Sequence, residues 1–180
     1  ADAEFTLEVW DAKLADVGER LRAARRAMLD DMAPILATAY DAVAQQAAMV
    51  ECHYESSWSG PLAEALLNSR DLDVRRGVTT VGPHRDEIHV TIAGAPARTH
   101  ASQGEQRSLA LALRLAADGV IRTVGVAEPV LLLDDVFSEL DPNRAGALLE
   151  ALPEGQRILT TAAGLPSAAR PDQVIRVHDS

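Results

Sequence analysis

The chain has 180 residues, of which 47% are hydrophobic, and a formal net charge of −10 at pH 7. The apolar content predicts a folded core, and the acidic balance argues against a domain that coats nucleic acid, since such domains are usually basic. No apolar run approaches the ~20 residues that span a bilayer, no secretory signal opens the sequence, and the single Cys52 allows no intrachain disulfide, so we expect a soluble intracellular protein.

Two helices are predicted at the start of the chain. Apolar residues recur at alternating spacings of three and four over residues 5–31, which is typical of a heptad seam. Pro34 interrupts this pattern and indicates the start of a second helix, whose apolar residues run from Leu36 to Val50. We expect the two seams to bury against each other, either in a projecting helical arm or as ordinary core helices.

The middle of the chain is predicted to change from helix to strand. A short helix over 62–68 leads into an arginine-rich turn over 70–77. β-branched and alternating apolar residues then predict three short strands, at 78–81, at 88–92 and near 97–99. The run Gly94-Ala95-Pro96 favours a hairpin connection between the last two.

The C-terminal part is predicted to alternate between helices and strands. Residues 105–122 carry one apolar face and predict a long helix. Residues 130–133 form a continuous apolar run, as a buried parallel strand would. A helix over 142–151 and strands over 157–161 and 173–177 follow. This alternation indicates the α/β class.

The predicted domains differ in structure and in charge. We expect a helical arm or lobe over 1–70 and an α/β part over 71–180. Residues 1–55 carry 11 acids against 5 bases, whereas residues 70–122 carry 8 arginines against 6 acids. Any DNA contact made by this chain would use the second stretch. The candidate phosphate contacts there are Arg70, Arg75, Arg76 and Arg85, although an arginine-rich turn is more often a solvated or ion-paired surface.

Residues 102–106 (Ser-Gln-Gly-Glu-Gln) stand immediately before the predicted helix 105–122. A serine and a glycine at a helix N-terminus offer a hydroxyl, an unhindered backbone N–H and the positive end of the helix dipole. Phosphate oxygens bind well to such a set of groups. On its own the pattern is weak, because Ser-x-Gly is also an ordinary helix cap.

Residues 130–135 (Val-Leu-Leu-Leu-Asp-Asp) place two carboxylates after an apolar strand. At the carboxyl edge of a parallel sheet, Asp134 stands where the Mg²⁺ of a nucleotide would bind. Asp135 could orient or deprotonate an attacking water. The alternative without a functional role is a buried strand followed by a solvated acidic turn.

Residues 138–142 (Ser-Glu-Leu-Asp-Pro) follow closely and, taken alone, form a helix-capping signal. The three motifs together, in this order, resemble the ABC-type ATPase family. Residues 102–106 resemble its signature loop, residues 131–135 its Walker B strand, and residues 138–141 its D-loop. The resemblance implies the C-terminal half of an ABC-type ATPase head, with a mainly parallel sheet flanked by helices.

Within that class the chain resembles the RecF family from about residue 50 to its C-terminus. The runs that carry the resemblance are residues 75–87 (Arg-Arg-Gly-Val-Thr-Thr-Val-Gly-Pro-His-Arg-Asp-Glu), 101–113 and 132–141. An Asp-Asp pair is typical of RecF, whereas transporter heads usually end Walker B with Asp-Glu. The first fifty residues fit the family's helical lobe by pattern only.

The resemblance implies that two protomers sandwich ATP and Mg²⁺. Ser102 and Gly104, with Gln103 and Glu105 in the same loop, would contact the γ-phosphate held by the partner. Asp134 would hold Mg²⁺ through water and Asp135 would position the hydrolytic water. Asp141 would sense the partner across the dimer, and Thr161 stands where many ABC heads place a histidine near the γ-phosphate, which implies weak hydrolysis.

The resemblance also implies the partners and the setting. RecF proteins clamp DNA at junctions of single strand and duplex, with RecO and RecR partners, in replication, gap repair and the SOS response. It therefore implies an ATP-dependent homodimer in the cytoplasm, associated with the nucleoid. For His84, beside the turn Gly82-Pro83, we favour a structural hydrogen-bonding role. The remaining histidines show no metal-site spacing.

A P-loop is missing from this sequence. Its phosphate-binding lysine follows a glycine run, whereas Lys13 is the only lysine here and lies inside a helix pattern. We therefore expect that a separate N-terminal ATPase lobe completes the head, and that this chain alone does not bind ATP usefully. Two alternatives stay open: another ABC-type head with a coiled-coil arm, and a non-catalytic dimerisation module.

Overall fold

The computed structural model describes residues 2–125, 128–138, 140–162 and 164–177. By its internal contacts the chain forms two compact units. Unit 1 comprises residues 1–34 and 49–101, and unit 2 comprises residues 35–48 and 102–180. The division at residue 70 that the sequence suggested stays a prediction.

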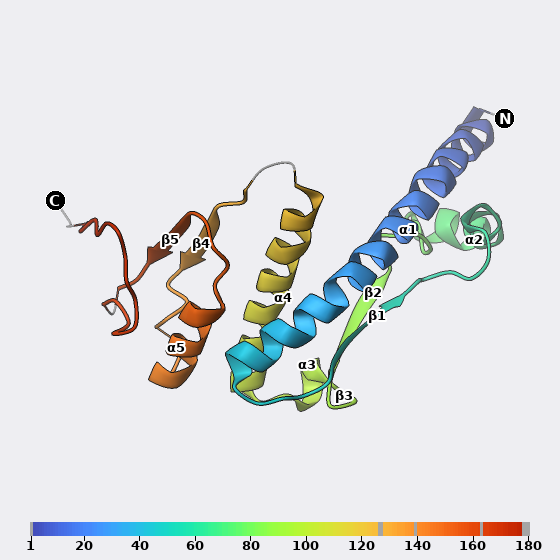
Figure 1. Ribbon diagram of the computed structural model, residues 1–180. Coiled ribbons are helices and arrows are strands. Elements are labelled where there is room, and N and C mark those ends of the chain that lie inside the picture. The colour runs from blue at the N-terminus through green and yellow to red at the C-terminus, as the bar shows by residue number, and fades with distance from the viewer. Residues whose placement is uncertain (1, 126–127, 139, 163, 178–180) are drawn as a thin grey trace. The chain divides into compact units, whose positions relative to one another are not determined.

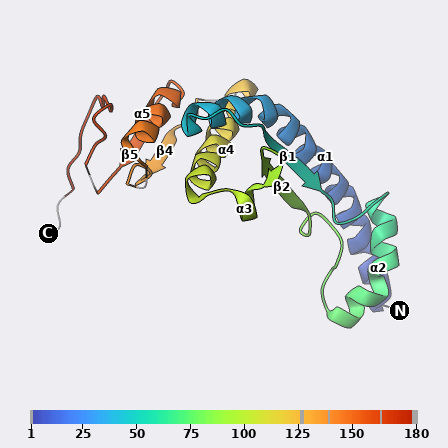
Figure 2. The same cartoon turned by 90° about the horizontal axis from the view of Figure 1, so that it is seen from below.

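The first element, α1, is one continuous helix over Asp2–Ala44 (Figures 1 and 2). The predicted break at Pro34 is wrong, because the proline lies inside the helix. A proline there removes one backbone hydrogen bond and costs about 3 kcal/mol. The turns that follow offset this cost, since Leu36, Tyr40 and Val43 are almost completely buried.

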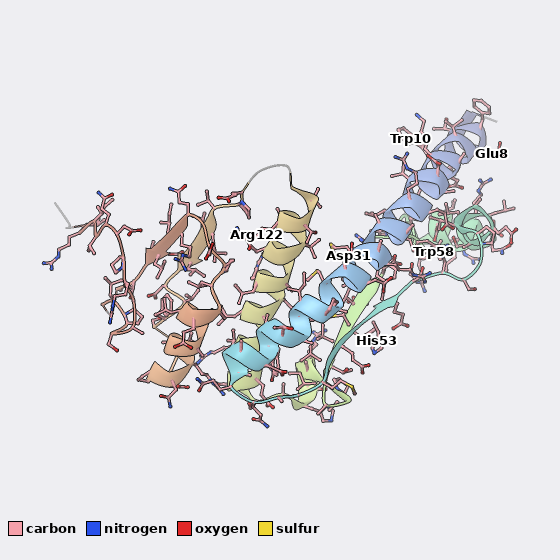
Figure 3. All side chains as sticks on the ribbon, in the orientation of Figure 1. Glu8, Trp10, Asp31, His53, Trp58 and Arg122 are labelled. Atoms are coloured by element: carbon pink, nitrogen blue, oxygen red, sulfur yellow. The ribbon has the colours of Figure 1, made fainter. Side chains whose placement is uncertain are left out.

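The face of α1 that packs in unit 1 includes Leu14 of the predicted apolar seam but otherwise differs from that seam. Trp10 and Val17, two members of that seam, are 61% and 57% exposed, and Trp10 projects from the N-terminal part of the helix (Figure 3). The packed face instead includes Gly18, which contacts Leu62, and Arg22, whose guanidinium stacks on Trp58 at 4.7 Å from the ring centroid. The prediction that two apolar seams bury each other is therefore wrong.

Unit 1 contains an antiparallel sheet of β1 (Val50–Glu55), β2 (Glu87–Ile92) and β3 (Ala95–Pro96), in that order. Strand β1 was not predicted, since Val50 had been assigned to a helix. The prediction of β2 is confirmed within one residue. Ala93 and Gly94 make the hairpin turn between β2 and β3, with φ angles of 50° and 80°, one residue earlier than predicted.

Helix α2 (Leu62–Arg76) is twice as long as predicted, so the arginine-rich turn is in fact its last turns. It ends at Gly77, which adopts the left-handed conformation with φ 67°. The strand predicted at 78–81 is absent from this described segment. Its backbone turns back onto α2 instead, where the N–H of Thr80 donates to Asp73 Oδ1 at 2.9 Å.

A short helix, α3 (Ala97–His100), takes the place of the third predicted strand. The core of unit 1 gathers around Trp58, Leu62 and Leu66. Leu14 of α1 and Val81 of the turn segment pack against these three side chains. The core therefore joins α1, α2 and the segment that precedes β2.

Unit 2 contains α4 (Gln103–Val124), β4 (Leu131–Asp134), α5 (Pro142–Ala151) and β5 (Arg157–Thr160). Strands β4 and β5 lie side by side and pair in parallel, which confirms the predicted α/β class (Figures 1 and 2). The predicted strand at 173–177 is not a strand in the described residues. In α4, Asp118 is buried and Arg122 pairs with it, with Nε 2.5 Å from Oδ2.

The two faces of β4 differ in burial. Leu133 is 7% exposed and packs inward, whereas Leu132 is 68% exposed. On the neighbouring strand, Ile158 is 48% exposed. The strand was predicted to be buried throughout, so this part of the prediction is wrong for the chain by itself. The two-stranded sheet leaves an apolar face uncovered.

Candidate functional site

Asp134 ends strand β4 at the carboxyl edge of the parallel pair, and Asp135 follows it directly. Asp134 is in register with Thr160 of β5, and the Thr160 hydroxyl donates to Asp134 Oδ1. The backbone N–H of Asp135 donates to both the carbonyl and the hydroxyl oxygen of Thr160, at 3.1 and 3.2 Å. Both aspartates are exposed. Thr160, which was not among the predicted site residues, thus holds both aspartates.

The backbone of Asp135 adopts the left-handed conformation, with φ 49°. Aspartate tolerates this region better than most residues, and the conformation turns the chain sharply at the strand end. Ser138 closes the turn, since its hydroxyl donates to the Asp135 carbonyl at 2.8 Å. The N–H of Ala162 lies 3.4 Å from Asp135 Oδ1. Glu139, part of the predicted D-loop, lies outside the described residues.

Ser102 is the N-cap of α4 and forms a capping box with Glu105. The Ser102 backbone N–H and hydroxyl donate to Glu105 Oε2 at 2.8 and 2.7 Å, and the Glu105 N–H donates to Ser102 Oγ at 3.3 Å. The Ser102 hydroxyl and N–H hold the pKa of Glu105 below its usual value, so the carboxylate stays charged. Gln103 and Gly104 occupy the first turn of the helix.

Asp141 caps α5 in a similar way. Its Oδ1 accepts from the N–H groups of Asn143 and Arg144, both at 3.0 Å. Thr161 lies apart from this cap, and its hydroxyl donates to the Gly164 carbonyl at 3.2 Å. Thr161 also lines a hollow of about 280 Å³ beside Phe137 and Pro142, near the start of α5.

Arg144 brings two predicted motifs together, although the sequence analysis did not single it out. Its Nε lies 3.6 Å from Asp141 Oδ2, and its guanidinium lies against Gly104. A side chain on Gly104 would overlap that guanidinium. The signal available in the sequence was the spacing of three between Asp141 and Arg144, which places the N-cap of α5 beside a side chain of its first turn.

The four arginines proposed for DNA contact are not equivalent. Arg70 is ion-paired with Asp11, with Nη2 2.8 Å from Oδ2. Arg75 and Arg76 are exposed in the last turn of α2. The guanidinium of Arg85 is held 3.3 Å from the Thr79 carbonyl through both Nε and Nη2. Arg85 is exposed as well, but its guanidinium already donates to a backbone carbonyl, so Arg75 and Arg76 are the favoured candidates of the four.

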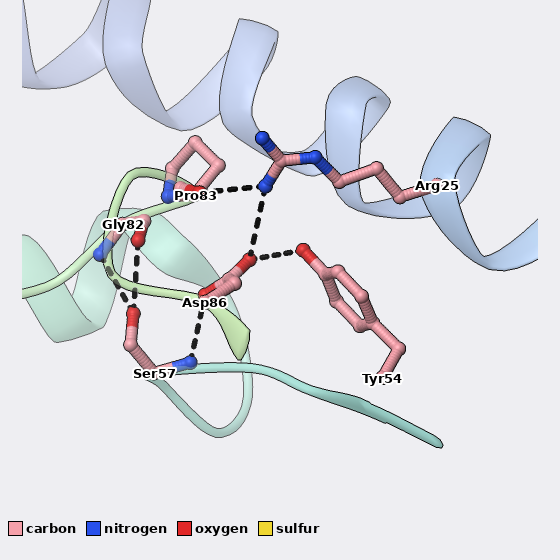
Figure 4. A network of polar contacts seen from close by, with 6 residues as sticks. All are labelled: Arg25, Tyr54, Ser57, Gly82, Pro83 and Asp86. Atoms are coloured by element: carbon pink, nitrogen blue, oxygen red, sulfur yellow. Dashed lines mark hydrogen bonds and ion pairs between the residues drawn. The ribbon is translucent and has the colours of Figure 1, made fainter. Parts of the chain in front are cut away.

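The segment over residues 82–86 is anchored by a polar network around Asp86, whose side chain is fully buried (Figure 4). Asp86 accepts hydrogen bonds from the Tyr54 hydroxyl and, at 2.8 Å, from the Ser57 N–H. Arg25 lies 3.8 Å from the same carboxylate and donates to the Pro83 carbonyl at 2.6 Å. The network ties the segment to α1 and to the end of β1.

This network also fixes the backbone that carries His84. The Ser57 hydroxyl donates to the Gly82 carbonyl at 2.9 Å and accepts from the Gly82 N–H at 3.0 Å (Figure 4). His84 Nε2 lies 3.1 Å from the Thr79 carbonyl, in hydrogen-bonding contact. This contact agrees with a structural role for the histidine.

Comparisons with known proteins agree with this geometry. No protein-family model matches the chain. The DNA replication and repair protein RecF of Frankia alni (strain DSM 45986 / CECT 9034 / ACN14a) is 43% identical over 173 residues, which cover 88% of this chain and 46% of that protein. A solved structure described as the recombination mediator protein RecF-ATPrS in the RecFOR pathway matches 94% of this chain with a TM-score of 0.78 and 30% identity.

A second RecF structure, described as RecF-ATP in the RecFOR pathway, matches 92% of the chain with a TM-score of 0.75 and 29% identity. Over the length that it spans, the chain matches RecF proteins in sequence and in fold. This confirms the resemblance that the three motifs carried. The two solved RecF structures support the α/β class of an ATPase head for the part that this chain spans.

The chain spans about half the length of the RecF proteins it matches, namely 46% of the curated relative and 47% and 46% of the two solved chains. Across the part of the chain that the structure describes, no helix is long and apolar enough to cross a membrane. The same described residues contain no group of three or more His, Cys, Asp or Glu side chains that could hold a metal ion by themselves. Any metal bound at Asp134 would need further ligands from elsewhere.

Proposed function

We propose that this chain is the C-terminal part of a RecF-type recombination mediator, an ATP-dependent DNA clamp that acts in replication and gap repair. The observation that carries the proposal is the pair Asp134 and Asp135, exposed at the carboxyl edge of a parallel strand pair in a chain 43% identical to RecF. Ligands bind at this edge in open α/β folds.

The loop that opens α4 is the proposed contact to nucleotide held by a partner protomer. Ser102 and Gly104 stand at the helix N-terminus, where backbone N–H groups and the dipole favour phosphate oxygens. Ser102 is engaged by Glu105, so its hydroxyl must turn away from that carboxylate to meet a phosphate. Gln103 and Asp141 complete the surface that faces the partner.

Asp134 suits a magnesium ion that is bound mainly by water and phosphate. One exposed carboxylate, oriented by the Thr160 hydroxyl, is the kind of single protein ligand that Mg²⁺ takes in nucleotide sites. When bound, the ion would neutralise charge on the phosphates. Asp135, held by Thr160 and Ala162, then orients the water that attacks the γ-phosphate.

A separate ATPase lobe is proposed to complete the head. The sequence contains no P-loop, and the matched RecF chains are about twice as long. Leu132 and Ile158 leave an apolar face on the β4–β5 sheet, and Trp10 and Val17 leave another on α1. Exposed apolar faces of this kind usually pack against another part of the same assembly. We propose that the remainder of the protein covers both.

DNA is the proposed substrate of the clamp, with RecR and RecO as protein partners. The matched proteins support this role, since one is a DNA replication and repair protein and another is a recombination mediator of the RecFOR pathway. Arg75 and Arg76 are the favoured phosphate contacts in this chain because they are exposed at the end of α2. Arg85 is a secondary candidate, and Arg70 is the weakest because Asp11 already pairs with it.

The catalytic part of the proposal is tested by Asp135→Asn in the full-length protein. We expect steady-state ATP turnover to fall by about 100-fold or more, since the amide cannot accept the proton of the attacking water, while ATP-dependent assembly persists. The matched control is Glu150→Gln, which changes an exposed acid of α5. This variant should turn over ATP at the wild-type rate.

Turnover that is unchanged in Asp135→Asn would contradict the catalytic role. If the wild type neither hydrolyses ATP nor assembles with it, the non-catalytic dimerisation module becomes the better description.

A further inference from the structure

Arg144 lies between the two motifs that are proposed to face the partner. Its Nε is 3.6 Å from Asp141 Oδ2, and a Cβ built on Gly104 would stand 3.0 Å from its Nη2 and 3.1 Å from its Cζ. One side chain from α5 therefore contacts the first turn of α4 and the cap of its own helix. About a third of the side chain is exposed, so it is also close to the surface.

The charge of Arg144 acts on the same region. Hydrogen bonds from Ser102 lower the pKa of Glu105 most, and the Arg144 guanidinium lowers it further. Burial raises the pKa of the nearby Tyr40 hydroxyl, with Glu105 adding to the rise and Arg144 opposing it. The guanidinium thus lies near two carboxylates, Glu105 and Asp141, each of which caps a helix. A cation between two caps favours bringing both helix starts together.

We propose that Arg144 is a positioning residue that holds the loop over residues 102–105 and the cap residue Asp141 in one fixed arrangement. The inference rests on the proposed function, in which both motifs must meet the partner protomer at the same time. Arg144 itself touches neither nucleotide nor metal in this scheme. It acts through Gly104, Glu105 and Asp141.

This role gives Gly104 a second requirement besides access for a phosphate. Any side chain at this position meets the guanidinium of Arg144 and must displace it. Gly104→Ala should displace the guanidinium and Arg144→Gln should remove it. Both changes should therefore break the same contact between Arg144 and the loop over residues 102–105. Two changes that break one shared contact are not additive, which distinguishes this link from two independent structural effects.

The test measures how much Mg-ATP the full-length protein needs for half-maximal dimerisation, by sedimentation velocity. For Arg144→Gln we expect that concentration to rise by about tenfold, as is typical for the loss of one charge-assisted contact. Arg144→Lys should recover part of the loss, because it keeps the charge but not the planar fork. The double variant with Gly104→Ala should need no more Mg-ATP for half-maximal dimerisation than the more severely impaired of the two single variants. The matched control is Arg114→Gln, which changes an exposed arginine of α4. This variant should dimerise at the same Mg-ATP concentration as the wild type.

Two controls separate the possible failures. The thermal unfolding midpoint without nucleotide shows whether a variant has simply lost stability, and Ser102→Arg shows whether the signature loop is needed at all. If Arg144→Gln dimerises like Arg114→Gln while Ser102→Arg does not, the role of Arg144 is wrong and the proposed function stands. Additive losses, or a loss that follows the unfolding midpoint alone, also overturn it. If the wild type does not dimerise with ATP, the proposed function and this inference fail together.

Discussion

At the scale of single residues, the motif positions were predictable and their partners were not. Asp134, Asp135, Ser102 and Asp141 stand out because their residue types follow a strand or precede a helix, which is local information. Arg144 and Thr160 act through contacts that form only when separate elements pack. The spacing of residues along the sequence does not predict that Thr160 pairs in register with Asp134.

The buried Asp86 shows the same limit. An acid in a Gly-Pro-His-Arg-Asp run reads as a surface residue, yet Asp86 is buried because Tyr54, Ser57 and Arg25 converge on it. Buried carboxylates persist only where such partners compensate the lost hydration. The partners come from α1 and β1, and β1 was not predicted.

Tyr54→Phe tests this network. Burial, then the hydrogen bond to Asp86, raises the pKa of the Tyr54 hydroxyl above its usual 10.0. A raised pKa means that the hydroxyl stabilises the fold fully below pH 10 and loses that contribution as the pH rises through the folded-state pKa. At neutral pH we expect the unfolding free energy of the variant to be about 1 kcal/mol lower than that of the wild type. Above pH 10 this difference should shrink as the pH rises.

The measurement combines urea unfolding with absorbance titration of the phenols. Tyr40 is the other tyrosine of the two in the sequence, so the wild-type minus variant titration isolates Tyr54. A Tyr54 phenol that ionises at its ordinary pH, with unfolding free energies equal in both proteins, would contradict the network.

At the scale of elements, length and type were predictable where one signal dominated. Helix α5 and strand β5 match their predictions within one residue, because apolar periodicity, caps and breakers agree there. Strand β1 was missed because Val50 continued the spacing of the preceding helix. Its alternating burial comes from pairing with β2, in which Glu55 lies opposite Glu87 and Val50 lies opposite the still more distant Ile92.

Helix α1 shows how a strong pattern can mislead. Its apolar seam includes Trp10 and Val17, but the packed face carries Gly18 and Arg22, which periodicity of hydrophobic residues does not register. A small residue permits close approach, and a charged side chain packs through its stem and its planar head.

Pro34→Ala tests the continuity of α1. The substitution restores a backbone donor in the helix interior, which favours the folded state, and frees the unfolded chain, which opposes it. We expect a net gain of about 2 kcal/mol in unfolding free energy, measured by urea unfolding of this chain. An exposed helix residue supplies the control, and Arg114→Ala should change stability by less than about 0.5 kcal/mol. A loss of stability in Pro34→Ala would show that the proline ends a helix, as the sequence had suggested.

At the scale of the whole molecule, the chain spans about half the length of the RecF proteins it matches and exposes apolar residues on the β4–β5 sheet and on α1. The family was identifiable from three short motifs because their order and their separation by a long helix are specific. The uncovered face at Leu132 and Ile158 could not be foreseen, since the apolar run reads as a buried strand when the rest of the sheet is assumed. The ATPase lobe proposed above would cover this face and so account for the exposure.

The central claim is that Ser102 belongs to a loop that engages nucleotide across a dimer. The most direct test is sedimentation of the full-length protein with and without Mg-ATP, comparing the wild type with Ser102→Arg. The account predicts that the wild type dimerises only with Mg-ATP and that the variant stays monomeric, because the larger side chain fills the space of the phosphate. Dimerisation of both proteins regardless of nucleotide would contradict it.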